Sequence, residues 1–340
     1  MSYNVLDIFS GAGGLMLGFE QEGFNIVLST DIDDDCEKVH RVNRPNSKYI
    51  KSDIYDLTDE KLSELLGGQE IDVLIGGPPC QGFSTIGARV SSDPETRLKH
   101  DPRNDLFREY IRILKFVNPK MFLFENVKGI KTRDKGRIFE DIEKTFKETG
   151  YDFKCVTLNA ADYGVPQIRE RVFLFGTRID AEFNEPMPTH GEGRLPYTTV
   201  LEAIGDLATL GNDPAINHMA LNHGEINVRR YQMIPEGGRM PEQDLPPELY
   251  RKNFGNTFKR LDRNKPSLTM VPGHNAFPIH PWLDRSLTVR EAARIQMFPD
   301  DYIFQGNRQK QCMQVGNAVP VGLAKAWAKK IKEVLDGYEG

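Results

Sequence analysis

Long apolar segments are absent from this sequence of 340 residues. No stretch approaches the roughly 18 consecutive apolar residues that a membrane-spanning helix needs. The first residues, MSYNVLDIF, lack the basic start and the cleavage site of a signal peptide. We therefore expect a cytoplasmic protein with no membrane partner.

Cysteine is also scarce. The four cysteines, Cys36, Cys80, Cys155 and Cys312, lie far apart, with no CxxC pair and no HExxH. Neither a zinc knuckle nor a disulfide framework is indicated. We expect four free thiols and no metal ion.

An excess of positive charge, the usual mark of a nucleic-acid partner, is missing too, because the formal net charge is -5. The distribution differs from the sum. Residues 221–270 contain nine Lys or Arg against six Asp or Glu, a local excess of three positive charges. A solvated surface explains this excess equally well.

Up to about residue 178, runs of β-forming residues alternate with helical stretches. The expected strands cover residues 3–9, 24–30, 71–77, 121–127, 153–160 and 171–178, and the expected helices residues 15–22, 36–43, 105–117 and 137–149. Alternation of this kind is typical of βαβ units around a mostly parallel sheet. We predict an α/β fold with a doubly wound, mostly parallel sheet.

The composition changes near residue 185. Residues 185–280 are rich in Pro, Gly, Asn and His and have few periodic runs, which indicates loops. Helical periodicity returns in residues 287–298 and 321–338. We predict a larger domain built from residues 1–184 and 281–340 and a smaller, loop-rich domain of residues 185–280.

A glycine-rich turn, DIFSGAGG, ends the first expected strand. Gly11 and Gly13 allow a close approach of backbone to a ligand, at a helix N-terminus that presents free N–H groups. Met16 occupies the third glycine's place in GxGxxG, so a purely structural turn remains an alternative. Asp31 lies 20 residues after Gly11, where an acid reaches ribose hydroxyls, and Asp53 could accept from an adenine amino group. The pattern predicts a nucleoside with a non-phosphate tail.

The segment GGPPCQG, residues 76–82, follows the apolar run IDVLI. Pro78 and Pro79 fix φ at two positions, so the arm ahead of Cys80 should be stiff. Most cysteines are small core residues, but a polar turn rich in Gly and Pro favours a functional thiol at the sheet edge that binds ligands. No histidine is placed to activate it, so a protease-type Cys–His pair is not indicated.

Glu125 follows four apolar residues in MFLFENVKG, and we expect it at the same sheet edge as Cys80. Partial burial would raise the pKa of this carboxyl and let it donate a proton. The alternative is a carboxylate that caps the following helix.

Three polar residues, Gln167, Arg169 and Arg171, alternate in QIRERVFLFG. A period of two predicts that they share one face at the entrance of a strand. Arginines in such a setting usually hold an acid or an anion.

Six segments, in their order, resemble the DNA (cytosine-5) methyltransferase family of the bacterial restriction-modification type. They are DIFSGAGGLMLGFE, GGPPCQGFS, ENVKG, QIRERVF, LTVREAARIQMFPDDY and QVGNAVP. The likeness covers about residues 4–180 and 284–334. It implies the Rossmann-like fold of S-adenosylmethionine-dependent methyltransferases, with residues 185–280 as the target-recognition domain.

The resemblance implies S-adenosyl-L-methionine as cofactor and S-adenosylhomocysteine as product. By similarity, Phe9 stacks on the adenine, Asp31 takes the ribose and Asp53 takes the adenine amino group. The whole set implied to contact the cofactor is Phe9, Ser10, Gly11, Ala12, Gly13, Gly14, Leu15, Asp31, Ile32, Asp53, Ile54, Pro78, Asn317, Ala318 and Val319. Two positions depart from the family pattern, since Asp31 stands where Glu is more frequent and Ile32 replaces an aromatic residue.

Cytosine carbon 5 is a poor nucleophile, so the ring needs activation by covalent addition. By similarity, the Cys80 thiolate attacks carbon 6, Glu125 hydrogen-bonds or protonates N3, and Arg171 holds the base oxygen and orients Glu125. Carbon 5 then takes the methyl group and loses its proton, and Cys80 leaves. The implied catalytic set also includes Pro79, Gln167 and Arg169.

The implied partner is double-stranded DNA whose target base leaves the stack. The long polar stretch after Cys80 is expected to close over DNA, with Ser84 and Arg103 as contacts. In the smaller domain, the expected DNA contacts are Arg229, Arg230, Arg260 and Arg263. We expect a monomer that acts in the cytoplasm, on the nucleoid, as the modification enzyme of a restriction-modification or phage-defence system.

Three other functions stay open. An RNA cytosine-5 methyltransferase of the same architecture would methylate tRNA in place of duplex DNA. A nicotinamide-dependent oxidoreductase would use the glycine turn and Asp31 but would give no role to Cys80 with Glu125. A silent DNA-binding protein is disfavoured because Cys80, Glu125 and Arg171 are all present.

Overall fold

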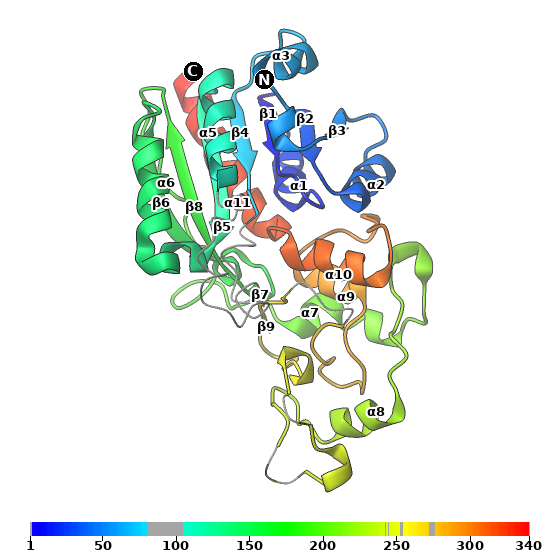
Figure 1. Cartoon of the computed structure of the whole chain (residues 1–340). Helices are drawn as coiled ribbons and strands as arrows, with labels where there is room; N and C mark the ends of the chain where they lie inside the picture. Colours follow the sequence, from blue (N-terminus) through cyan, green and yellow to red (C-terminus); the bar gives the residue numbers. More distant parts are fainter. Residues whose placement is uncertain are drawn as a thin grey trace. The chain divides into compact units, whose positions relative to one another are not determined.

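The computed structural model describes residues 2–79, 105–241, 243, 245–251, 254–271 and 276–339. The chain forms two compact units, coloured along the sequence in Figure 1. Unit 1 consists of Met1–Asn159, Glu170–Met187 and Ala324–Gly340, and unit 2 of Ala160–Arg169 and Pro188–Leu323. Unit 2 is larger than the expected segment 185–280, whose role as a target-recognition domain stays a prediction. Within the described residues, no helix has both the length and the apolar character needed to span a bilayer.

A seven-stranded sheet in the order β3-β2-β1-β4-β5-β8-β6 forms the centre of unit 1. Its strands are β1 (Asn4–Ile8), β2 (Asn25–Asp31), β3 (Tyr49–Lys51), β4 (Val73–Gly76), β5 (Met121–Val127), β6 (Asp152–Asn159) and β8 (Glu170–Thr177). The pairs among β1 to β5 are parallel, which confirms the predicted mostly parallel sheet. β8 pairs antiparallel with β5 and β6. The connection from β6 to β8, residues 160–169, is shorter than the dozen or so residues of a parallel crossover.

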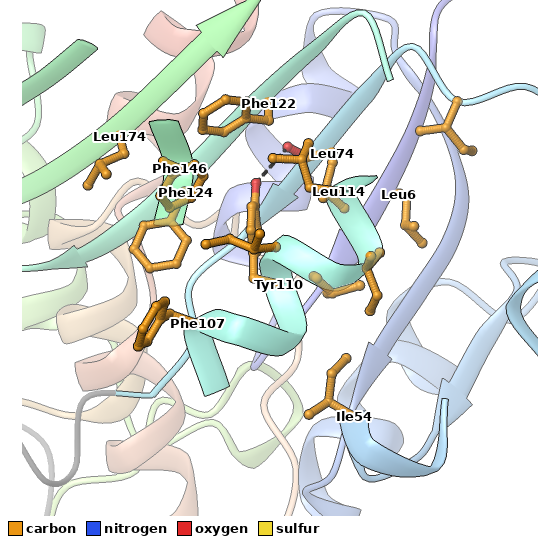
Figure 2. Close-up of a cluster of buried hydrophobic side chains, with 14 of the residues drawn as sticks. Leu6, Ile54, Leu74, Phe107, Tyr110, Leu114, Phe122, Phe124, Phe146 and Leu174 are labelled. Carbon is orange, nitrogen blue, oxygen red and sulfur yellow. Dashed lines mark hydrogen bonds between the residues drawn. The ribbon is translucent and has the colours of Figure 1, made fainter. Parts of the chain in front are cut away.

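Helices cover both faces of this sheet. Among the described residues, the α-helices of unit 1 are α1 (Gly14–Gln21), α2 (Asp34–Asn43), α3 (Asp59–Leu66), α5 (Leu106–Val117), α6 (Arg137–Lys147) and α11 (Val321–Glu339), the last of which begins in unit 2. On one face, α3, α5 and α6 pack on strand residues in a large apolar cluster, shown in Figure 2. At its centre the Tyr110 hydroxyl donates to the Leu74 carbonyl oxygen at 3.1 Å.

On the other face, Trp327 of α11 lies over Phe173 and Phe175, with ring centroids 5.2 Å and 4.7 Å away. Gly18 of α1 backs directly onto α11, since a Cβ there would come within 2.5 Å of Ala324 Cβ. Burial of these aromatic rings and of the cluster in Figure 2 is the main apolar stabilisation of unit 1.

The strand order reverses between β1 and β4, which lie side by side. Open α/β sheets bind ligands outside the carboxyl ends of the strands at such a point. The turn after β1 carries DIFSGAGG, and the arm after β4 carries Gly77, Pro78 and Pro79. The glycine turn and the arm that leads to Cys80 therefore follow neighbouring strands of the sheet.

Unit 2 has little regular structure. Its elements are β7 (Gln167–Ile168), α7 (Val200–Ile204), α8 (Glu225–Gln232), β9 (Ser267–Leu268), α9 (Val289–Ile295), α10 (Arg308–Asn317) and the first three residues of α11. β7 and β9 pair in parallel. A small apolar cluster forms around Tyr231, Ile234 and Phe258. Helix α9 begins at a capping box made by Thr288 and Glu291, two residues later than the periodicity predicts.

Candidate active site

The turn after β1 adopts an unusual backbone conformation. Phe9 has a φ of 57°, and Gly11 and Gly13 have φ of 53° and 78°. A Cβ on Gly11 would meet no atom within 4 Å, so its backbone conformation, not lack of space, calls for glycine. Residues with large side chains, such as Phe9, rarely adopt positive φ, and such outliers cluster at functional sites.

Asp31, the last residue of β2, holds this turn from the neighbouring strand. Its Oδ2 accepts from the Gly11 N–H at 2.8 Å, and its Oδ1 accepts from the Asp33 N–H at 3.0 Å. Burial raises the pKa of the Asp31 carboxyl above its usual value. The acid expected at the ribose thus also shapes the glycine turn.

Two further expected cofactor contacts follow the neighbouring strands β2 and β3. The Ile32 side chain is 62% exposed, although it is apolar. Asp53 caps a short turn, since its Oδ1 accepts from the Tyr55 N–H at 3.1 Å, and Ile54 beside it is buried. The contacts of Ile32 and Asp53 with a cofactor stay predictions.

The end of β4 requires glycine at two positions for lack of space. A Cβ on Gly76 would lie 2.4 Å from the Ile8 carbonyl oxygen, and one on Gly77 would lie 2.6 Å from Glu125 Oε2. The two glycines therefore permit close packing at the end of β4. Asn126 Nδ2 donates to the Pro78 carbonyl oxygen at 3.3 Å, which anchors the arm that leads to Cys80.

Glu125 lies within β5, opposite Phe173, so it does not cap a helix. Arg171 Nε lies 2.9 Å from Glu125 Oε1, and the side chains are only 10% and 11% exposed. Arg171 Nη1 also donates to the Glu170 carbonyl oxygen at 2.8 Å. The structure therefore brings together the acid and the arginine of ENVKG and QIRERVF, beside the backbone of Gly77.

Three expected site residues, Cys80, Ser84 and Arg103, lie outside the described residues. Pro78 is buried and Pro79 is exposed, directly ahead of Cys80. The structure therefore describes Gly77, Pro78 and Pro79, the arm that leads to Cys80.

Burial alternates along QIRER, since Gln167, Arg169 and Arg171 are buried while Ile168 and Glu170 are exposed. The three residues do not share one strand, because Gln167 lies in β7 and Arg171 in β8, which belong to different sheets. Arg169 belongs to unit 2, where its guanidinium group donates to backbone carbonyl oxygens. Its Nη2 donates to the carbonyl oxygens of Gly316 and Ala318 at 2.8 and 2.9 Å, and its Nη1 to that of Met270 at 3.3 Å.

Through these contacts Arg169 fixes the end of α10, the segment GNAVP expected to contact the cofactor. Asn317 is the last residue of α10 and is exposed, while Ala318 and Val319 are buried. Gln167, also in unit 2, has neither amide atom hydrogen-bonded to another described residue, although its side chain is fully buried. A buried amide of this kind is costly and favours a functional explanation.

Comparison with known proteins identifies the family. The model of the C-5 cytosine-specific DNA methylase family matches residues 3–333. The chain belongs to this family. It is therefore a C-5 cytosine DNA methyltransferase, and the resemblance found in the sequence is confirmed.

Relatives of this methyltransferase span nearly its whole length. The Type II methyltransferase M1.HphI of Haemophilus parahaemolyticus is 39% identical over 97% of this chain and 87% of its own. M.DdeI of Desulfomicrobium norvegicum is 34% identical over 96% and 88%. A crystal structure of a DNA modification methyltransferase from an E. coli prophage matches with a TM-score of 0.79 and 26% identity, over 98% of this chain and all of that one.

A more distant likeness, to the DNMT2 structure of Spodoptera frugiperda, shows the fold alone. Its TM-score is 0.65 and its identity 18%, over 97% of this chain and all of that one. The predicted Rossmann-like methyltransferase fold is confirmed.

Two of the four arginines expected to contact DNA bond to groups of unit 2 itself. Arg230 donates to the carbonyl oxygens of Leu249 and Tyr250 at 2.9 and 3.2 Å. Arg260 donates to four backbone carbonyl oxygens and to the Asp284 carboxylate. Both side chains are buried, so their contacts assign them to the core of unit 2 in place of a DNA contact.

The other two expected DNA contacts lie at the surface. Arg229 pairs with Glu248 at 2.8 Å, and Arg263 pairs with Glu236 at 2.8 Å and lies 4.7 Å from the centre of the Trp282 ring. Exposed ion pairs are weak and exchange readily, so these guanidinium groups keep the capacity to bind phosphate.

Three residues of this site escaped the sequence analysis. Asn126 holds Pro78, His40 contacts the glycine turn, and Asp7 lies buried in β1 below that turn. Asp7 stands among apolar residues of a strand, and His40 stands on the buried face of a helix. Such positions rarely carry polar side chains, so both residues gave a detectable signal in the sequence. Asn126 gave no signal of its own beyond its place after Glu125.

Proposed function

We propose that this enzyme methylates carbon 5 of a cytosine in double-stranded DNA through a transient bond between Cys80 Sγ and carbon 6. One observation carries the proposal. The Glu125–Arg171 ion pair contacts the chain at Gly77, three residues before Cys80, so an acid and a cation stand where the cysteine arm begins. A nicotinamide-dependent oxidoreductase would have no use for this arrangement.

Cys80, Glu125 and Arg171 each contribute to the activation of the cytosine ring. Addition of the Cys80 thiolate to carbon 6 pushes negative charge onto the ring, and Glu125 neutralises it by hydrogen bonding or proton transfer at N3. Arg171 fixes the Glu125 carboxylate by its ion pair, and in the proposed mechanism it also holds the base oxygen. Carbon 5 becomes nucleophilic, takes the methyl group and loses its proton, after which the carbon 6–sulfur bond breaks.

The residues around the glycine turn suit S-adenosyl-L-methionine. Asp31 and Asp53 offer acceptor oxygens for ribose hydroxyls and an adenine amino group, and Ile32 offers an exposed apolar face. Phe9, held at positive φ, begins the turn, and Gly11 leaves open space beside its backbone. The bound cofactor supplies an electrophilic methyl group. The expected contacts of Asn317, Ala318 and Val319, which belong to unit 2, stay predictions.

The chain's relatives support a place in restriction-modification, since M1.HphI and M.DdeI are named Type II methyltransferases. We propose that this protein likewise modifies a specific duplex sequence. Its target base must leave the helix, because a thiolate cannot reach carbon 6 of a stacked base.

Replacement of Cys80 tests the mechanism. Wild-type protein should transfer tritium from labelled S-adenosylmethionine into duplex DNA and form a covalent complex with DNA containing 5-fluorocytosine, and C80A should do neither. Cys155, a free cysteine of β6, gives the matched control C155A, which should do both. Methyl transfer by C80A would refute the covalent mechanism.

The same assay distinguishes the nucleic acid. Incorporation into bacterial genomic DNA that lacks the modification, with none into tRNA, is expected. Incorporation into tRNA alone would favour the RNA methyltransferase alternative.

A further inference from the structure

The ring of His40 contacts the glycine turn, although the sequence did not indicate His40 as a site residue. His40 lies in α2 and is fully buried, and its Nε2 is 3.1 Å from the Gly11 carbonyl oxygen. A carbonyl oxygen only accepts, so Nε2 carries the proton and donates it. Its Nδ1 has no hydrogen-bond partner among the described residues. Burial lowers the pKa of His40 to about 3, so the ring is neutral at ordinary pH.

This contact completes the restraint of one residue. The Gly11 N–H donates to Asp31 Oδ2 at 2.8 Å, and the Gly11 carbonyl accepts from His40. The peptide planes on both sides of Gly11 are thus held by side chains, at a φ of 53°. The His40 ring is itself held by the Tyr49 ring, stacked at a centroid distance of 4.3 Å.

We propose that His40 is a positioning residue for the cofactor, which fixes the Gly11 carbonyl and keeps the glycine turn in its binding conformation. The inference rests on the proposed function, in which this turn contacts S-adenosylmethionine. Glycine has the greatest backbone freedom of any residue, so a released Gly11 would sample many conformations. Ordering it again would then weaken cofactor binding. The chemistry at Glu125 and Cys80 would be untouched.

Two substitutions separate the donor from the rest of the ring. H40Q places an amide N–H at about the position of Nε2, whereas H40N has an amide that reaches only as far as Nδ1. For H40N we expect the Kd of S-adenosylhomocysteine, measured by calorimetry, and the KM of S-adenosylmethionine to rise about five- to tenfold, the effect of one hydrogen bond. Its kcat at saturating cofactor should stay within about twofold, and H40Q should restore tight binding.

A neighbouring residue controls for lost stability. Val39, also fully buried in α2, has an apolar side chain that forms no hydrogen bond. We therefore expect V39A to lower the urea concentration at the midpoint of unfolding and to leave the Kd of S-adenosylhomocysteine unchanged. Equal Kd values for wild type, H40Q and H40N would overturn the inference, as would a Kd for V39A raised as far as that for H40N. A wild-type protein that binds no S-adenosylhomocysteine would instead refute the proposed function itself.

Discussion

Arg171 Nε lies 2.9 Å from Glu125 Oε1, and the two residues occupy diagonal positions on the antiparallel strands β8 and β5. Diagonal neighbours on one face of a sheet lie within reach of long side chains. The pair is thus built by strand register, and neither side chain depends on a loop for its place. A rigid platform of this kind suits a group that must meet one ring nitrogen in a fixed orientation.

Replacing Glu125 by glutamine should remove the acid and keep its shape. We expect E125Q to lower the single-turnover rate of methyl transfer by about 10²- to 10⁴-fold, the usual contribution of an acid or base. Glu170 of β8 is an exposed carboxylate paired with Lys128, so E170Q is the matched control and should keep the wild-type rate. An E125Q rate within a few fold of wild type would exclude Glu125 from the chemistry.

A side chain at Gly77 should disturb the same acid from the other side. In G77A the new Cβ would lie 2.6 Å from Glu125 Oε2, which forces the carboxylate to move. We expect the rate to fall by roughly tenfold to a hundredfold, because displacements near 1 Å cost that much. Gly337 has no atom near the position of a Cβ, so G337A should leave the rate unchanged. The single-turnover rates of both variants, compared at saturating cofactor, are the measurement, and an unaffected G77A would contradict the assigned geometry.

The sequence was sufficient for most of unit 1 because its signals are local. Residues 121–127 were predicted as a strand and form β5 with the same bounds. Helix α3 escaped notice, although Thr58 caps its start and Gly67 ends it in a left-handed conformation. The reversal of β8 was not predicted, since it depends on the length of the preceding connection and not on the strand's own residues.

Side-chain partners were harder to predict than the strands that carry them. The spacing of QIRER indicated which side chains are buried, but the partners of Arg169 come from Met270, Gly316 and Ala318, about 100 to 150 positions away. Charge alone likewise could not separate buried Arg230 and Arg260 from exposed Arg229, because no local pattern records a long-range contact.

Substitution of arginines in unit 2 should expose this difference. R260Q leaves several carbonyl oxygens and Asp284 without their donor, so we expect a loss of about 3 kcal/mol or more in the free energy of unfolding. R229Q removes an exposed ion pair and should change stability by less than about 1 kcal/mol. Urea unfolding without DNA gives both values. An R260Q protein as stable as wild type would show that the contacts of Arg260 do not stabilise unit 2.

Asp7 should make stability depend on pH. It lies in β1 with 1% exposure, and its burial outweighs the hydrogen bond that the Ser10 side chain offers to the carboxyl group. Burial raises its pKa from 3.8 to about 7, so the folded state holds a proton that the unfolded state releases. Asp7 therefore lowers stability progressively as the pH rises from about 4 through 7, where the folded protein must bury a charge.

D7N removes that charge at every pH, so it should raise the free energy of unfolding at pH 8 by on the order of 3 kcal/mol. The gain should shrink toward pH 4, where wild-type Asp7 is protonated in the folded state. Urea unfolding at pH 8, 6 and 4.5 without cofactor measures it, with D301N, at an exposed aspartate, as a control that should not change the trend. A D7N protein less stable than wild type at pH 8 would mean that the Asp7 carboxylate is charged and has a stabilising partner in the folded protein.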